Sequence, residues 1–240
     1  MWAVCKKEFR QFFSSLTGYI AIIVFLLLTG LLLFVFPDTS ILDFGYATLE
    51  KFFDLAPWVL LLLIPAISMR SFSEEFRSGT FEILQSRPLT YWQMVLGKYA
   101  AALLVILIAL LPTWIYFFSV QHLATQSGMD MGATLASYIG LFFLTAVFAA
   151  IAICCSSFTT NAIVTFIFSA FACFLLYTGF HAISRMSVFP AGVDYYIDLV
   201  GIDFHYRNMS RGVITFRDLV YFISVIAFFL TLSRNNLLKR

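Results

Sequence analysis

Six apolar runs that carry almost no charge recur along this chain of 240 residues, and they restrict it to very few folds. Most of them approach the roughly 17 to 25 residues that a helix needs to cross about 30 Å of hydrocarbon. A soluble domain is excluded because 61% of the residues are hydrophobic and only 12% are charged, which leaves too little polar surface. The sequence therefore predicts an all-α membrane protein with six transmembrane helices in one domain, residues 1–240. We place these helices at Gly18–Phe36, Phe53–Met69, Tyr99–Val120, Ala133–Cys155, Ala162–Phe180 and Leu219–Leu232.

The positions of the basic residues predict which side of the membrane each connection occupies, because Lys and Arg concentrate in cytoplasmic loops. With the N-terminus inside, ten of the 15 basic residues lie in cytoplasmic segments and five in outer segments. We therefore expect both termini and the segment Arg70–Lys98 in the cytoplasm. The ten are Lys6, Lys7, Arg10, Arg70, Arg77, Arg87, Lys98, Arg234, Lys239 and Arg240, and the five are Lys51, Arg185, Arg207, Arg211 and Arg217. The net charge of +2 is too small to indicate nucleic-acid binding.

Residues 2–16 are expected to form a separate amphipathic helix that lies in the cytoplasmic interface of the membrane. Its aromatic and apolar side chains recur at helical spacing, and its cations occupy the opposite face. The alternative is that these residues extend the first transmembrane helix. No small-x-small cleavage site follows the first apolar run, so we expect a retained signal anchor.

The charged segment Arg70–Lys98 is long for a loop between two transmembrane helices, and its residues predict a rigid structure. Residues 70–77 are expected to continue the second helix, and Gly79 to end it. Thr80 is expected to cap a new short helix, Phe81–Ser86, and Thr90 with Gln93 matches a capping box at the start of the third transmembrane helix. The alternative is a solvated loop without fixed structure.

The same short helix carries Phe81, Ile83 and Leu84 in a segment otherwise rich in charge. An exposed helix with apolar residues is a docking surface for a partner. Two further connections are expected to be simple, a tight cytoplasmic turn at Ser156–Asn161 and short outer helices in His181–Asp218. Pro57, Pro65 and Pro112 are expected to bend the second and third spans.

The run EEFRSGTFEILQSRPLTYWQMVLGK, residues 74–98, resembles the first cytosolic loop of ABC-2 type transporter permeases. The six spans, the N-terminal interfacial helix and the outer helices fit the same family. Within it, FFDLAPWVLLLLIPAISMRSFSEE and NMSRGVITFRDLVYF resemble the gliding-motility-associated permease subunit of bacteria related to the flavobacteria. The resemblance implies a type V exporter-like subunit in a bacterial inner membrane.

The resemblance also implies partners. The permease would pair with a second permease half, identical or not, and a separate ATP-binding subunit would bind ATP and Mg²⁺. An auxiliary gliding-motility membrane protein is a further expected partner, along with membrane lipid. Residues 81–86 would be the coupling helix that enters a cleft in the ATP-binding subunit, the N-terminal helix would lie beside it, and Ser156–Asn161 would make a lesser contact. The residues implied in docking are Glu74, Glu75, Arg77, Gly79, Thr80, Phe81, Glu82, Leu84 and Pro88.

The sequence contains no candidate catalytic, cofactor-binding or metal-binding site. It has no Walker A loop, since Tyr99 follows Gly97-Lys98 and Trp92 stands where that motif needs glycine. Three alternatives remain beside an ATP-driven permease. One is a mechanical subunit that transmits force without moving a solute. The second is an ion-coupled transporter, which the scarcity of charge inside the six runs disfavours. The third is an intramembrane enzyme, which the three histidines outside those runs disfavour.

Overall fold

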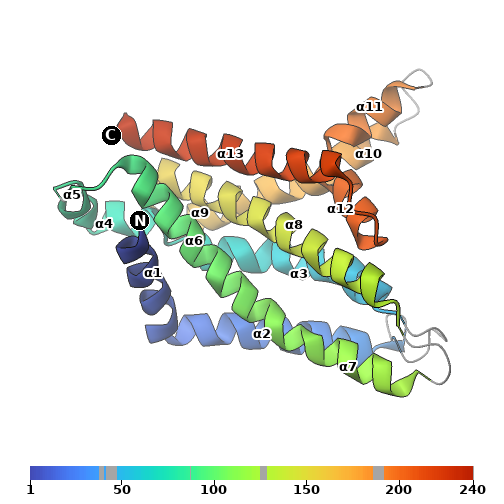
Figure 1. Ribbon diagram of the computed structural model, residues 1–240. Coiled ribbons are helices and arrows are strands. Elements are labelled where there is room, and N and C mark those ends of the chain that lie inside the picture. The colour runs from blue at the N-terminus through green and yellow to red at the C-terminus, as the bar shows by residue number, and fades with distance from the viewer. Residues whose placement is uncertain (38–40, 42–47, 87, 125–128, 186–191, 240) are drawn as a thin grey trace.

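The computed structural model describes residues 1–37, 41, 48–86, 88–124, 129–185 and 192–239, and these residues form helices joined by short turns, without a strand among them (Figure 1). The all-α class predicted from the apolar runs is confirmed. The helices are α1 (Trp2–Ser14), α2 (Leu16–Phe34), α3 (Glu50–Ser68), α4 (Ser73–Arg77), α5 (Thr80–Gln85), α6 (Tyr91–Leu110), the 3-10 turn η2 (Leu111–Thr113), α7 (Trp114–Leu123), α8 (Met131–Phe158), α9 (Ala162–Phe174), the π-turn η3 (Leu175–Gly179), α10 (Phe180–Ser184), α11 (Val193–Val200), α12 (Ile202–Ser210) and α13 (Phe216–Leu238).

Helix α8 is the centre of the bundle. Within its most apolar window 78% of the residues are buried, whereas the same measure is 22% for α9 and for α13, so those two helices lie at the periphery. Asp130 begins α8, where its carboxylate accepts hydrogen bonds from the backbone N–H groups of Gly132 and Ala133. Small buried residues then line the helix and let its neighbours approach closely. Helices α3, α6, α9, α12 and α13 all pack against it.

Five of the described helical segments are long and apolar enough to cross a membrane. They are Glu50–Arg77, Tyr91–Leu123, Met131–Phe158, Ala162–Ser184 and Phe216–Leu238. A sixth crossing arises only if α1 and α2, which are bent by 70° at their junction, are counted together. The structure thus has five or six candidate spans where the sequence predicts six, and the last one, expected to be short, is the 23-residue helix α13.

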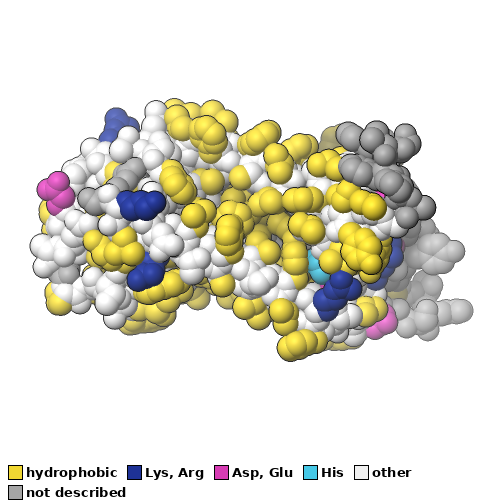
Figure 2. Space-filling model, turned by 90° about the horizontal axis from the view of Figure 1, so that it is seen from above, with side chains coloured by type: hydrophobic (Ala, Val, Ile, Leu, Met, Phe, Trp, Pro, Cys, Tyr) yellow, Lys and Arg dark blue, Asp and Glu magenta, His cyan; other side chains and the backbone are white. Residues whose placement is uncertain are grey.

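The membrane-crossing segments run between two ends of the molecule that both carry charged side chains. Both termini lie at the end that carries α1, α4 and α5, whereas α7, α11 and α12 lie toward the other end (Figure 1). Hydrophobic side chains cover the middle of the molecule as seen from above, and charged side chains gather toward its two ends (Figure 2). An uncharged belt between two polar ends is the surface that a lipid bilayer requires.

Two connections differ in detail from their predicted forms. The turn expected at Ser156–Asn161 is shorter, because α8 continues to Phe158 and Asn161 already caps α9 through its side-chain oxygen. Residues 70–77 do not simply continue the second helix, since a turn at residues 69–72 separates α3 from α4. Pro112 interrupts the third span as expected, within the 3-10 turn η2. Helix α3, in contrast, runs through Pro57 and Pro65 without a break.

The far end of the bundle is held by a buried contact between a histidine and an aspartate that the sequence did not reveal. His205 of α12 is 1% exposed, and its Nδ1 lies 2.6 Å from Asp218 Oδ1 on α13. Its Nε2 lies 3.0 Å from the carbonyl oxygen of Leu199, and the Tyr221 ring stacks on it at 3.9 Å. Both ring nitrogens therefore have a hydrogen-bonding partner, which fixes the orientation of the imidazole. The expected short helices in His181–Asp218 are present as α11 and α12, while residues 186–191 lie outside the described part.

Candidate functional site

The charged segment between the second and third spans folds as two short helices with a sharp reversal between them. Gly79 adopts φ +68°, a left-handed conformation that a residue with a side chain rarely takes. This glycine, rather than Thr80, stands at the N-cap of α5, so the expected capping by the Thr80 side chain is wrong. The Thr80 hydroxyl instead hydrogen-bonds to the Ser78 hydroxyl at 2.9 Å, and it makes no cap to the backbone of α5.

Aromatic packing fixes α5 against α4. The Phe76 ring stacks on Phe72 with centroids 6.1 Å apart and meets Phe81 edge-on at 4.8 Å. Phe81 is 6% exposed, and burial of a side chain of this size stabilises a structure by about 1.5–3 kcal/mol. The predicted rigidity of the segment therefore has a physical basis.

The segment returns to the bundle through a capping box at the start of α6. The Gln93 backbone N–H donates to Thr90 Oγ1 at 3.3 Å, and the Thr90 backbone N–H donates to Gln93 Oε1 at 3.2 Å. This arrangement satisfies two backbone donors that a helix start otherwise leaves without partners. The predicted capping box is confirmed.

Lys98 joins this segment to α1 and α6, and its side chain is fully buried. Its Nζ lies 2.8 Å from Glu8 Oε1, 3.0 Å from Glu75 Oε2 and 2.6 Å from the carbonyl oxygen of Ser71. The ammonium also sits 4.8 Å from the centre of the Phe72 ring. Lys7 adds a second cation, 2.8 Å from Glu75 Oε1. We call Lys7, Glu8, Glu75 and Lys98 the ion-pair cluster; its formal charges sum to zero, as burial requires.

Gly97 lets α1 approach α6 closely enough for the ion-pair cluster to form. A Cβ at this position would lie 2.8 Å from Val4 Cβ and 3.0 Å from the carbonyl oxygen of Met1, both shorter than ordinary contacts. Cys5 follows on the same face of α1 and is 2% exposed. Burial, and secondarily the Glu8 carboxylate, raises the pKa of the Cys5 thiol. Gly97 therefore provides the surface on which α1 packs, and the ion pair of Lys98 with Glu8 holds α1 against α6.

The nine residues expected to dock a partner divide into an exposed and a buried group. Glu75, Phe81 and Leu84 are buried in the segment itself, where they hold its shape. The remaining six are exposed: Glu74, Arg77, Gly79, Thr80, Glu82 and Pro88. Ile83, which is 62% exposed, lies among them on α5. The buried residues can support a docking face but cannot themselves form it.

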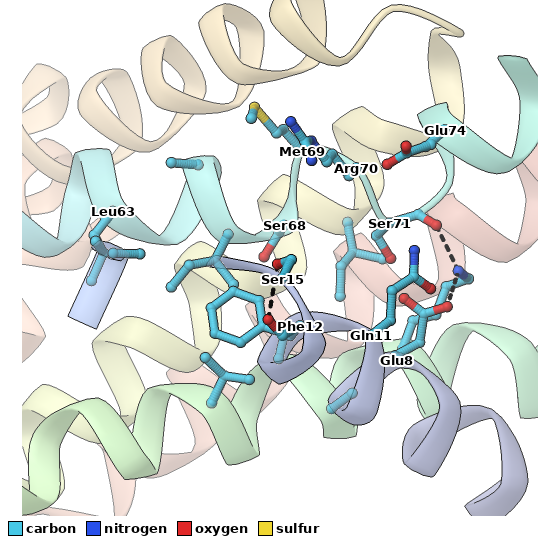
Figure 3. Close-up of a pocket in the computed structure, with 18 of the residues that line it drawn as sticks. Glu8, Gln11, Phe12, Ser15, Leu63, Ser68, Met69, Arg70, Ser71 and Glu74 are labelled. Atoms are coloured by element: carbon cyan, nitrogen blue, oxygen red, sulfur yellow. Dashed lines mark hydrogen bonds and ion pairs between the residues drawn. The ribbon is translucent and has the colours of Figure 1, made fainter. Parts of the chain in front are cut away.

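A cavity of about 480 Å³ opens beside the ion-pair cluster, between α1, α2, α3 and α6. Glu8, Gln11 and Phe12 of α1 lie along one side, and Ser68, Met69, Arg70 and Ser71 along the other (Figure 3). Its volume falls within the roughly 300–1,000 Å³ of small-molecule pockets.

The sequence matches the profile of a family described as ABC-2 family transporter protein over residues 2–233, which is nearly its whole length. The chain belongs to this family. No curated protein shows significant sequence similarity to it. Membership makes the chain a permease, the membrane subunit of an ABC transporter, and implies an ATP-binding partner and a dimeric membrane assembly.

Two features of the permease escaped prediction from sequence, although each left a signal. The ion-pair cluster combines Glu8 from the polar face of α1 with Glu75 and Lys98, which stand near the two ends of the charged segment. A lysine directly before a long apolar run needs a counter-ion when it is buried, and the paired acids of the segment supply one. The cavity depends on how α1 and α2 bend apart, and neither periodicity nor charge encodes that angle.

Proposed function

We propose that the exposed face of α5 is the coupling helix through which a separate ATP-binding subunit drives this permease. The supporting observation is the position of α5 at the end that carries both termini, where Glu82 and Ile83 are exposed on a helix fixed from below by Phe81. Both termini are then cytoplasmic, in agreement with the excess of basic residues on that side, and the membrane is the bacterial inner membrane.

The proposed mechanism is mechanical transmission through the ion-pair cluster. When the ATP-binding subunit moves α5, the displacement passes to α4 through the Phe76–Phe81 contact. Glu75 on α4 then acts on Lys98 at the base of α6 and, through it, on Glu8 of α1. The transmembrane helix α6 and the N-terminal helix α1 thus respond together. ATP and Mg²⁺ are bound by the partner, and two permease halves enclose the pathway of an unidentified substrate.

Co-purification tests the docking face. Glu82→Lys combined with Ile83→Asp changes two exposed side chains of α5, and we expect loss of the ATP-binding subunit from the purified complex. The matched control is Arg211→Glu with Val213→Asp at the opposite end of the bundle, where Val213 is 57% exposed. Unchanged assembly in the α5 variant, or equal loss in both, argues against docking at α5.

The process served by the complex is proposed to be gliding motility, on the resemblance of residues 52–75 and 208–222 to gliding-associated permeases. Deletion of the chain should abolish spreading on a surface. The second candidate is a subunit that transmits force to an envelope machine without moving a solute, and the rigid path from α5 to α1 favours it equally. Loss of motility with an unchanged set of exported molecules supports the second candidate; loss of one exported species supports transport.

A further inference from the structure

The cavity beside the ion-pair cluster has an apolar end and a polar end. Side chains of α2, α3 and α6 form the apolar end, among them Ala21, Leu63, Ile67 and Val105. Side chains that follow the apolar stretch of α3 form the polar end together with the second half of α1. A water-soluble ligand would leave the apolar end uncovered, and a hydrocarbon would leave the polar end without partners. The cavity is therefore shaped for an amphiphile.

The polar end offers one unpaired cation and one unpaired anion. Arg70 and Glu74 both line the cavity and are exposed, and within the described chain neither forms an ion pair (Figure 3). Lys98 differs, because three acceptors within 3.0 Å already occupy its ammonium group. Ser68, which also lines the cavity, is 3% exposed, and its Oγ has no hydrogen-bond partner among the described residues. Buried hydroxyls usually have such a partner.

We propose that the cavity binds one phospholipid with a primary-amine headgroup, phosphatidylethanolamine, from the leaflet on the side of the two termini. Its phosphate pairs with the Arg70 guanidinium, and its ammonium donates hydrogen bonds to the Glu74 carboxylate. One acyl chain lies along the apolar end. Arg70 follows directly on the apolar stretch of α3, which sets it at the depth where lipid headgroups lie.

The charges at the polar end of the cavity discriminate among lipid headgroups. A quaternary ammonium has no N–H to donate to Glu74, so phosphatidylcholine makes one contact fewer. An anionic headgroup such as phosphatidylglycerol brings no cation and leaves the carboxylate unpaired. The loss of one hydrogen bond to a charged group corresponds to about a ten-fold lower occupancy. The bound lipid contacts α1, α3 and α6 together. It therefore adds to the packing between α1 and α6 that the ion-pair cluster stabilises.

Photo-crosslinking of the full chain in lipid nanodiscs, with its copurified partners, tests this site. The probe is phosphatidylethanolamine with a diazirine in its acyl chain, compared with the same acyl chain on phosphatidylcholine and on phosphatidylglycerol. We expect about ten-fold more adduct on the cavity segments of α3 and α6 with the ethanolamine probe. Ala66→Phe fills the cavity and should remove the adduct, whereas Leu62→Phe, one turn away and 56% exposed, should not.

A second variant keeps the test decisive if Ala66→Phe fails to fold. Glu74→Gln should abolish the preference for the ethanolamine probe, and Glu50→Gln, an exposed acid at the other end of α3, should leave it intact. Equal labelling by the three probes overturns the proposal, since it indicates ordinary contact with bulk lipid. A preference that survives in Glu74→Gln overturns it as well.

Discussion

Replacing Lys98 by methionine is the sharpest perturbation of this permease, because the lysine ammonium is fully buried among two carboxylates and a carbonyl oxygen. Removing one member of a buried ion pair costs about 3–5 kcal/mol, since the other charges remain buried without a partner. Lys7 still lies 2.8 Å from Glu75 and compensates part of this loss. We therefore expect the lower value, about 3 kcal/mol.

This loss of free energy weakens the contact between α1 and α6. The reactivity of Cys5 reports on that contact. The thiol is 2% exposed and its pKa is raised by burial, so it should react slowly with a maleimide while α1 is docked. A loss of about 3 kcal/mol raises the population of undocked α1 roughly a hundred-fold, at 1.36 kcal/mol for each ten-fold. The labelling rate follows that population when opening and closing are fast. Mass spectrometry of the peptide that contains Cys5 measures the rate.

Lys6→Met is the matched control, because Lys6 is exposed on the same helix and such changes usually stay within about 0.5 kcal/mol. We expect its Cys5 labelling to stay within about two-fold of the unsubstituted chain. Equal labelling of Cys5 in Lys98→Met and Lys6→Met refutes the reasoning, since it shows that the ion-pair cluster does not hold α1.

Three further substitutions test other contacts. Gly97→Ala places a methyl group 2.8 Å from Val4 Cβ, so we expect an overpacking cost of about 1–3 kcal/mol and about ten-fold faster labelling of Cys5; unchanged labelling would show that α1 does not rest on Gly97. Thr90→Ala removes the capping box and should destabilise the first turn of α6 by about 1 kcal/mol, seen as faster hydrogen exchange of its amides. His205→Ala removes the hydrogen-bonding partner of the buried Asp218 carboxylate, so limited proteolysis should cut residues 193–215 faster than in His122→Ala, and equal rates would contradict a holding role for His205.

Features carried by composition and local spacing could be predicted from the sequence. Six apolar runs predict the helical bundle because a helix must satisfy its own backbone in lipid. Thr90 and Gln93 predict a helix start because their hydrogen bonds are made within four residues. Gly79 predicts a reversal because a glycine adopts the left-handed region without strain.

Features that depend on distant segments could not be predicted in the same way. The sequence shows that Phe81, Ile83 and Leu84 are apolar residues in a charged segment, but only the fold shows that Phe81 and Leu84 turn inward while Ile83 remains exposed. Thr80 is a good capping residue, yet the left-handed Gly79 takes the N-cap position instead. The pairing of Lys98 with Glu8 joins residues 90 positions apart, and its existence depends on the bend between α1 and α2.

The central claim is that the exposed face of α5 meets the ATP-binding subunit. A photoreactive amino acid in place of Ile83, which is 62% exposed on α5, tests it directly in the assembled complex. The matched position is Phe118 of α7, which is 61% exposed near the opposite end of the bundle. We predict a covalent adduct with the ATP-binding subunit at position 83 and none at position 118. An adduct only at position 118, or none at position 83 in a complex that retains the ATP-binding subunit, contradicts the account.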